Sequence, residues 1–249
     1  MSSLDETIFA CIDCETTGLD KAKDRVLEVA CALFRGEEVI EEFQTLVNPK
    51  CEIPHDSFKI HKISKEMVKE SPTIDVVLPR IFAVVGSYPI IGHGIGFDVE
   101  ILVNEAKRHN ITTTLDKNTL VDTLRLGRLY GESPTNSLDM LRSHFNIPEE
   151  GAHRAMNDVM VNIKVFRHLV QKYKTYSQVL DALSRPILMK AFPLGKYKGR
   201  LFKDLPLDYL YWCLRQDFDM DLMYSVNHEL KKRKKGNLFS QVANPFQSL

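Results

Sequence analysis

The sequence predicts an α/β protein, in which a mixed sheet flanked by helices is followed by a small, basic, mostly helical C-terminal module. Three strand-like segments open the chain, and strand and helix patterns then alternate. Its 249 residues suffice for one medium domain and a small one. Residues 185–249 carry 12 Lys/Arg and six Asp/Glu, a net charge of +6, whereas residues 1–184 carry a net −6. This asymmetry favours an acidic first domain and a basic second one.

The first strands are predicted by apolar runs bounded by turn residues. Residues 7–14 form an apolar segment that ends at the Thr-Thr-Gly turn of residues 16–18. Two further strands are expected over residues 26–34 and 38–47, joined by a hairpin turn at residues 35–37. Together they predict an antiparallel meander of three strands.

The rest of the first domain alternates between helical and strand patterns. Helices are expected over residues 73–85, 98–109, 123–130, 137–145 and 155–173, and short strands over 88–92 and 119–122. Two short helices are expected near 207–215 and 222–235. The predicted organisation is a domain of residues 1–175, a C-terminal module of residues 186–235 and a loose tail of residues 236–249.

Composition narrows the classes of protein that are compatible with the chain. Apolar content of 44% and charged content of 27% are ordinary for a soluble protein. The N-terminus lacks the basic and apolar regions of a signal peptide, and no apolar run is long enough for a membrane span. We therefore expect a cytoplasmic protein without a membrane partner. Cys11 and Cys14 match C-x-x-C, but on a strand they point to opposite faces and cannot bind one ion.

Four acidic residues and one histidine are the candidate functional residues. Asp13 and Glu15 are two apart on a strand, so their side chains leave the same face roughly 7 Å apart. Asp98 stands at a helix start, and Asp158 lies at the border of the apolar stripe of a late helix. His153 precedes that helix in a loop. Singly, these residues have ordinary explanations: strand-end acids, a helix cap and a surface histidine.

Taken together, the five residues suit phosphodiester hydrolysis. Carboxylates are hard oxygen ligands for Mg²⁺ or Mn²⁺, and neutral imidazole accepts protons near pH 7. Burying an unpaired carboxylate is costly, so carboxylates next to apolar segments suggest a function.

The order of these residues resembles the DnaQ-like 3′–5′ exonucleases of the DEDDh type, over roughly residues 7–172. The matching pieces are Asp13-Cys14-Glu15-Thr16-Thr17-Gly18-Leu19, Val47-Asn48-Pro49, His61-Lys62-Ile63-Ser64, Gly92-His93…Phe97-Asp98, Val121-Asp122-Thr123-Leu124 and His153-Arg154-Ala155-Met156-Asn157-Asp158. The chain departs from the family at Gly94, where Asn is usual, and at Asn157, which replaces a common acid.

The resemblance implies an RNase H-like fold and a role for each matching residue. It assigns the binding of two divalent metal ions, Mg²⁺ or Mn²⁺, to Asp13, Glu15, Asp98 and Asp158. It makes His153 the general base. It also implies that Thr16, Thr17 and Gly18 bind the 3′-terminal nucleotide and that His61 lies near the substrate.

The implied function is a metal-dependent 3′–5′ exonuclease that releases nucleoside 5′-monophosphates. Its substrate would be the single-stranded or frayed 3′ end of a nucleic acid, with DNA favoured. The role would be proofreading or repair, like that of the DNA polymerase III epsilon subunit, with a DNA polymerase as a partner. An RNA exonuclease of the oligoribonuclease or RNase T kind is the alternative enzyme. A non-catalytic nucleic-acid-binding polymerase accessory protein is the alternative of another class, although the intact set of five residues argues against it.

The C-terminal module is similar to one appended to exodeoxyribonuclease X-like proteins, over residues 195–212. Its glycine-flanked lysines and Tyr197 could contact phosphates and stack on bases. Tyr209 and Trp212 could instead fill a small core, which is the favoured interpretation for Trp212.

Overall fold

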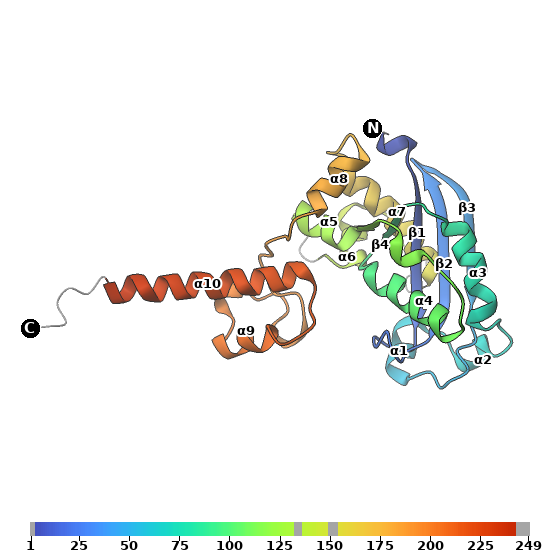
Figure 1. The fold of residues 1–249 in the computed structure, drawn as a ribbon, viewed down its shortest axis with the longest axis horizontal. Coiled ribbons are helices and arrows are strands. Elements are labelled where there is room, and N and C mark those ends of the chain that lie inside the picture. Colours follow the sequence, from blue (N-terminus) through green and yellow to red (C-terminus); the bar gives the residue numbers. More distant parts are fainter. Residues whose placement is uncertain (1–2, 132–135, 149–153, 243–249) are drawn as a thin grey trace, which may run out of the picture. The chain divides into compact units, whose positions relative to one another are not determined.

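The computed structural model describes residues 3–131, 136–148 and 154–242, with side chains as far as residue 234. The chain divides into two compact units, Met1–Leu183 and Ser184–Leu249. The first unit contains a five-stranded sheet between two layers of helices (Figure 1). The predicted mixed sheet flanked by helices is therefore confirmed.

The sheet combines an antiparallel meander with two parallel strands, in the order β3-β2-β1-β4-β5. The meander comprises β1 (Ile8–Thr16), β2 (Val26–Arg35) and β3 (Glu38–Leu46), as the sequence predicts. The short strands β4 (Ile90–Gly92) and β5 (Leu120–Asp122) extend the sheet, with β4 parallel to β1 and β5 parallel to β4.

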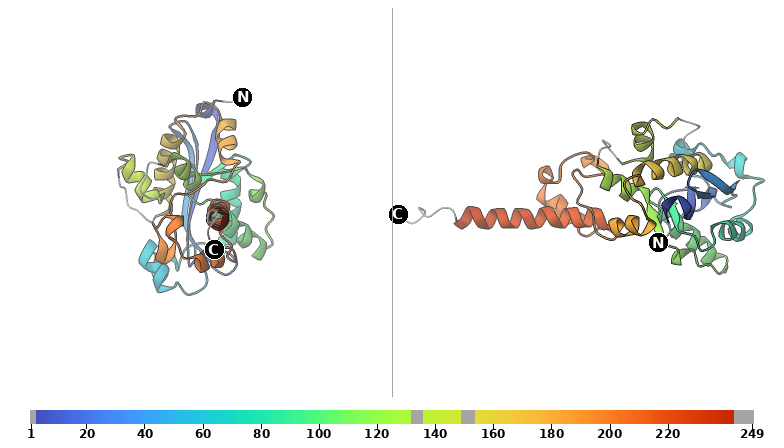
Figure 2. Two further views of the ribbon diagram at one scale, coloured as in Figure 1. Left: turned by 90° about the vertical axis from the view of Figure 1, so that its left-hand side faces the viewer. Right: turned by 90° about the horizontal axis from the view of Figure 1, so that it is seen from above.

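Alternate residues of the strands enter two different cores, because side chains along a strand point to opposite faces. On one face, Ala10 and Ile12 of β1 pack with α3 (Ile74–Val85) and α4 (Gly96–Arg108). On the other face, Phe9 and Cys11 pack with α5 (Thr123–Tyr130), α6 (Leu138–His144), α7 (Ala155–Val170) and α8 (Tyr176–Leu183). Figure 2 shows the helical layers on the two sides of the sheet.

Two short helices, α1 (His55–His61) and α2 (Lys65–Val68), follow the meander and bury a small separate cluster with Leu27 and Ile63. Cys11 and Cys14 belong to opposite faces, as expected for their strand, and both are free thiols. The first unit extends to Leu183, beyond the predicted limit at residue 175, because α8 buries Val179 and Leu183 in the same core as α7.

The second unit has its own core, built by α9 (Leu207–Cys213), α10 (Met220–Val242) and the segment before them. Helix α10 continues to Val242, so residues 236–242 are helical rather than part of the predicted loose tail. A single glycine, Gly236, weakens a helix by about 1 kcal/mol but does not end it. The predicted mostly helical module is confirmed. Within the described residues, none of the helices combines the length and apolarity that a membrane crossing requires.

Candidate active site

Three of the four predicted metal-binding acids meet beside strand β1. Asp13 and Glu15 point toward the face of the sheet that α7 covers, and Asp158 lies in the first turn of α7. Each of the three carboxylates offers an oxygen, and these oxygens lie within 4.8 Å of one another. Residues 145 positions apart thus form one cluster of hard oxygen donors, which is the donor type that Mg²⁺ and Mn²⁺ prefer.

Asp98 approaches the same part of β1 from the first turn of α4. Its side chain is buried, and its Oδ1 accepts a 2.9 Å hydrogen bond from the backbone N–H of Cys14. Cys14 lies between Asp13 and Glu15 on the strand, so this bond fixes the fourth acid beside the other three. We call Asp13, Glu15, Asp98 and Asp158 the acidic site.

The pKa values within the acidic site are raised because desolvated carboxylates lie close together. Desolvation raises the pKa of Asp13, and the charges of Asp98 and Asp158 raise it further. Desolvation, together with the charge of Asp158, raises the pKa of Glu15 to about 7. Burial likewise raises the pKa of Asp98 to about 7. A divalent cation would relieve this repulsion, so the residues present fit a metal site.

A fifth carboxylate, Glu28, lies beside the acidic site and was not predicted from the sequence. Glu28 of β2 stands opposite Glu15 in the sheet register and is fully buried. Arg154 binds it through Nη2 (2.8 Å to Oε1) and Nε (3.0 Å to Oε2), and the N–H of Ala155 donates to Oε2 at 3.2 Å. Gln44 donates a further bond to Oε1 at 2.7 Å. These bonds lower the pKa of Glu28 despite its burial.

The Glu28–Arg154 pair fixes the start of α7. Ala155 is the first residue of that helix, and the carbonyl of Arg154 accepts a hydrogen bond from the N–H of Asp158 at 3.1 Å. The pair thereby positions the helical turn that carries Asp158. The sequence marks the two members singly, as a lone acid inside the apolar run of residues 26–34 and an arginine between His153 and the helix, but it does not show that they pair. His153 itself lies outside the described residues.

In the turn before α4, Gly94 stands where the resemblance leads us to expect Asn. Gly94 has φ +76°, a left-handed conformation that Gly adopts freely and Asn tolerates. The carboxylate of Asp122, which caps α5, accepts hydrogen bonds at 2.9 Å from the N–H groups of Gly94 and Leu124. The bond from Gly94 to Asp122 holds the turn that leads to Asp98.

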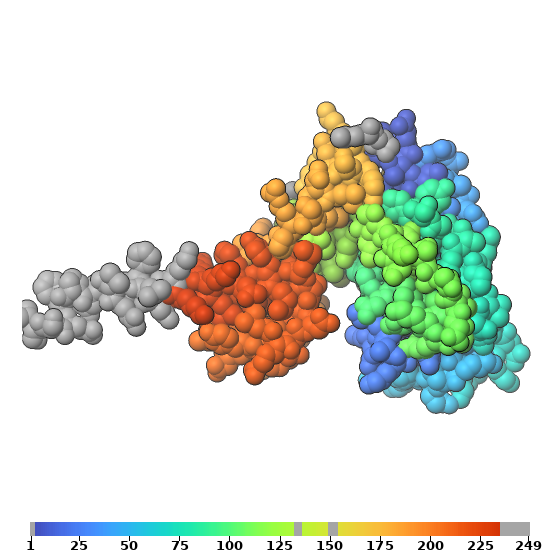
Figure 3. Space-filling view, viewed as in Figure 1, coloured from blue at the N-terminus to red at the C-terminus, as the bar shows by residue number. Residues whose placement is uncertain are grey.

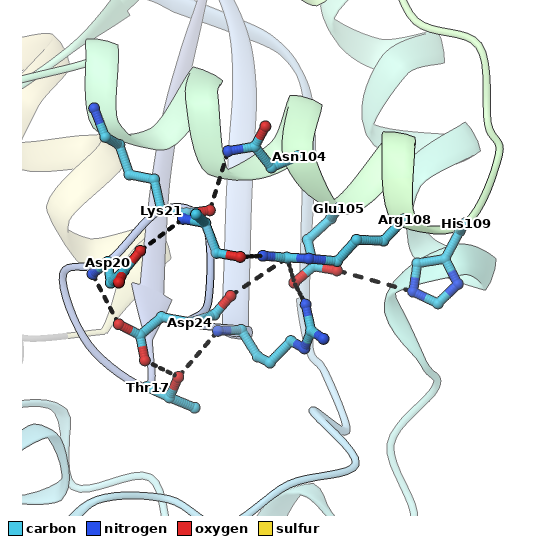
Figure 4. A network of polar contacts seen from close by, with 10 residues as sticks. Thr17, Asp20, Lys21, Asp24, Asn104, Glu105, Arg108 and His109 are labelled. Carbon is cyan, nitrogen blue, oxygen red and sulfur yellow. Dashed lines mark hydrogen bonds and ion pairs between the residues drawn. The ribbon is translucent and has the colours of Figure 1, made fainter.

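The predicted nucleotide cradle begins at Thr16, the last residue of β1, and continues through Thr17 and Gly18 into the following loop. The Thr17 hydroxyl donates to Asp24 Oδ1 at 2.8 Å and accepts from the N–H of Arg25 at 3.0 Å (Figure 4). The Thr16 hydroxyl donates to the carbonyl of Gly18 at 2.7 Å. A Cβ on Gly18 would lie 2.5 Å from Asp24 Oδ2, so the loop packs too closely for a larger residue there.

Helix α4 braces this loop from its C-terminal half (Figure 4). Glu105 is fully buried and lies 2.9 Å from Nη1 of Arg108 and 3.5 Å from Nη1 of Arg25. Asn104 donates to the carbonyl of Lys21 at 3.0 Å, and Arg108 donates to the carbonyl of Asp24 at 3.4 Å. One helix thus carries Asp98 at its start and holds the loop at its end.

His61 does not join the acidic site through any contact that the described residues make. It is buried in α1, and its Nδ1 accepts a 2.9 Å hydrogen bond from the N–H of Ile63. Burial lowers its pKa, and the charge of Glu28 partly offsets this effect. Its proximity to the substrate stays a prediction.

Comparison with known proteins agrees with this geometry. Residues 10–166 match the family model described as "Exonuclease". The DNA polymerase III subunit epsilon of Aquifex aeolicus is 30% identical over 165 residues, which are 66% of this chain and 81% of that protein. The DNA polymerase III PolC-type of Caldanaerobacter subterraneus is 31% identical over 195 residues, 75% of this chain but only 14% of that much longer relative.

Solved structures share the fold at lower identity. A structure titled exonuclease X in complex with 5′ overhanging duplex DNA has 22% identity and a TM-score of 0.56, covering 70% of this chain and 98% of that one. A zinc-bound Escherichia coli ExoI–ssDNA complex has 23% identity and a TM-score of 0.60, covering 72% of this chain and 43% of that one.

A second family model, described as "Putative quorum-sensing-regulated virulence factor", matches residues 181–230. The resemblance of this segment to the exodeoxyribonuclease X-like module stays a prediction. For the first unit, the predicted DnaQ-like family and its RNase H-like fold are confirmed. The chain belongs to the exonuclease family.

Proposed function

We propose that this chain is a metal-dependent 3′–5′ exonuclease that releases nucleoside 5′-monophosphates from DNA ends, in proofreading or repair. The observation that carries the proposal is the convergence of three carboxylates within 4.8 Å, with Asp98 tied to the same strand by the Cys14 N–H. Membership of the exonuclease family supports the reaction type. The names of the epsilon and PolC-type relatives support DNA as substrate and a DNA polymerase as partner.

The four acids of the acidic site would bind the metal, which we propose to be two Mg²⁺ or Mn²⁺ ions. When bound, such ions supply positive charge that stabilises the charge developing on the phosphate oxygens. His153 would accept the proton of the attacking water at an imidazole nitrogen. Thr16, Thr17 and Gly18 would hold the terminal nucleotide, with His61 near it.

The test is digestion of 5′-labelled DNA and RNA oligomers of matched sequence, in Mg²⁺, in Mn²⁺ and in EDTA. We expect stepwise shortening of DNA from the 3′ end, release of nucleoside 5′-monophosphates, and no reaction in EDTA. Asp158→Asn should lose the activity, whereas the exposed control Asp139→Asn should keep it. Faster digestion of RNA would favour the RNA exonuclease. Shortening of neither oligomer would overturn the enzymatic proposal in favour of a nucleic-acid-binding protein.

A further inference from the structure

The second unit carries a basic hairpin that contributes Phe192 to the core and leaves its cations exposed. Residues 191–201 form this hairpin, in which the N–H of Phe192 donates to the carbonyl of Arg200 at 2.7 Å and Ala191 bridges Leu201. Four exposed cations lie on or just after the hairpin: Lys196, Lys198, Arg200 and Lys203. Even with the two nearby acids, Asp204 and Asp208, residues 195–212 carry a net charge of +2. The hairpin is therefore a positive surface.

Aromatic rings continue from this hairpin onto helix α9. The ring centroids of Tyr197 and Tyr209 lie 4.5 Å apart, and Tyr209 stacks on Trp212 at 5.1 Å with an interplanar angle of 21°. Trp212 is 41% exposed and lies outside the core cluster of the unit, so the favoured prediction that it fills this core is wrong. The core is completed instead by Phe192 and Leu210, among others. A large exposed indole is thus left available for contacts beyond the chain.

The cations lie beside the rings rather than away from them. Lys196 Nζ is 5.0 Å from the ring centroid of Tyr197 and 5.8 Å from that of Tyr209. The guanidinium carbon of Arg200 is 5.4 Å from the centroid of Tyr197. Aromatic rings alternating with cations can stack on bases and bind the phosphates between them, which is the recurring pattern of single-strand recognition. Figure 3 shows this unit as a compact body coloured orange to red.

We propose that Lys196, Tyr197, Arg200, Tyr209 and Trp212, hereafter the aromatic–basic surface, bind single-stranded nucleic acid outside the acidic site. A base would stack on Trp212, and neighbouring phosphates would contact Lys196 and Arg200. The choice of occupant rests on the proposed nuclease function. The positive charge of the surface agrees with this choice, because a nucleic acid strand carries one negative charge per nucleotide.

The test measures binding without digestion and uses the full chain. A fluorescent, single-stranded oligothymidylate is titrated in EDTA and followed by anisotropy. Trp212→Ala should weaken binding about 5- to 150-fold, the range for loss of one base–aromatic stack. Tyr224→Ala is the matched control, because it removes a ring of similar exposure from α10 of the same unit and should leave binding unchanged.

Salt dependence tests the cations. The double variant Lys196→Ala/Arg200→Ala should lower the slope of log K against log salt by about 1.4, because each lost contact to a single-strand phosphate contributes about 0.7. Trp212 is the chain's one tryptophan, so its emission reports on this surface alone. Binding should quench it. Thermal unfolding of each variant checks that the fold persists.

Three results would overturn the inference: equal affinities for Trp212→Ala and Tyr224→Ala, an unchanged salt slope in the double variant, or binding without any change in Trp212 emission. Equal affinities and an unchanged salt slope are the results expected if the surface binds an acidic peptide instead of the oligomer. Failure of the proposed function looks different, since a chain that digests no DNA or RNA in Mg²⁺ could still bind the oligomer through Trp212 in EDTA.

Discussion

Two groups of carboxylates in the first unit differ in how their charge is compensated. Glu28 and Glu105 are fully buried, and each faces arginine: Glu28 faces Arg154, and Glu105 faces Arg25 and Arg108. In the acidic site, by contrast, three carboxylates lie close to one another. The charges that most strongly affect Asp13 are those of other carboxylates, and they raise its pKa.

The difference separates acids that hold the structure together from the acids that we propose bind metal. A desolvated carboxylate is costly unless its charge is compensated, and arginines compensate Glu28 and Glu105, whereas the carboxylates of the acidic site raise one another's pKa values. A divalent cation, as proposed above, would supply positive charge to this cluster of carboxylates. The paired acids in turn hold the elements that present the others, since Glu28 fixes the start of α7 and Glu105 binds α4 to the loop of residues 17–25.

Loss of one member of the acidic site should give the largest effect. We expect Asp158→Asn to lower kcat on the order of 10³-fold or more, because the metal's stabilisation of the transition state is worth several kcal/mol. Single-turnover digestion in Mg²⁺ measures this. Near-normal turnover in this variant would remove Asp158 from the metal site.

Loss of an acid that is paired with arginine should lower the stability of the fold rather than kcat directly. We expect Glu28→Gln to lower the free energy of unfolding by about 2–3 kcal/mol, below the roughly 3–5 kcal/mol typical for broken buried pairs, because the partner Arg154 is partly exposed and can be rehydrated. Urea unfolding measures this change.

The control for Glu28→Gln is Glu41→Gln, which breaks the exposed pair with Arg80 and should cost less than about 1 kcal/mol. If the two variants were equally stable, the Glu28–Arg154 pair would not hold α7 as described.

The packing of Gly18 tests the braced loop. Gly18→Ala should lower the free energy of unfolding by about 1–2 kcal/mol, because the new Cβ displaces the Asp24 carboxylate from its bonds to Thr17 and Asp20. Gly96→Ala is the control, since a Cβ there meets no atom within 4 Å and Ala favours the helix. Thermal and urea unfolding of both variants measure these changes. An unchanged free energy of unfolding in Gly18→Ala would mean that the loop is flexible enough to accept the Cβ.

His93 provides a test with a smaller expected effect, which asks whether a histidine supplies positive charge to the acidic site. Burial lowers its pKa to about 4, and its Nδ1 lies 3.1 Å from the Thr123 hydroxyl, so it is neutral and does not compensate the acids. A base whose pKa is lowered on folding contributes stability above its unfolded pKa, near 6.5, and loses it as the pH falls from there toward 4.

Relative to His93→Gln, the wild-type chain should therefore lose about 1 kcal/mol of unfolding free energy between pH 7.5 and 5.5. Urea unfolding of both proteins at both pH values measures the difference, in which the other titrating groups cancel. If the wild type instead gained unfolding free energy relative to His93→Gln as the pH falls, His93 would be charged in the folded chain and would serve as a counter-charge to the acids.

The fold and the acids of the site were largely predictable because their signals are local. Apolar runs and turn residues predicted the meander, and local sequence patterns placed Asp13, Glu15, Asp98 and Asp158 in their strand and helices. The arginine pairing of Glu28 was not predictable, because Arg154 lies 126 residues away and only the tertiary fold brings them together. Helix α8 was missed because its burial depends on a core built by other segments.

The measurement that tests the central claim most directly compares Asp13→Asn with the wild type at pH 8, first in EDTA and then with Mn²⁺. If the acidic site is kept for a metal, the variant should unfold at the same or a higher temperature in EDTA, because one repelling charge is gone. Calorimetry should then show Mn²⁺ binding to the wild type and strongly weakened binding to the variant. A variant that is less stable in EDTA yet binds Mn²⁺ with wild-type affinity would contradict the account.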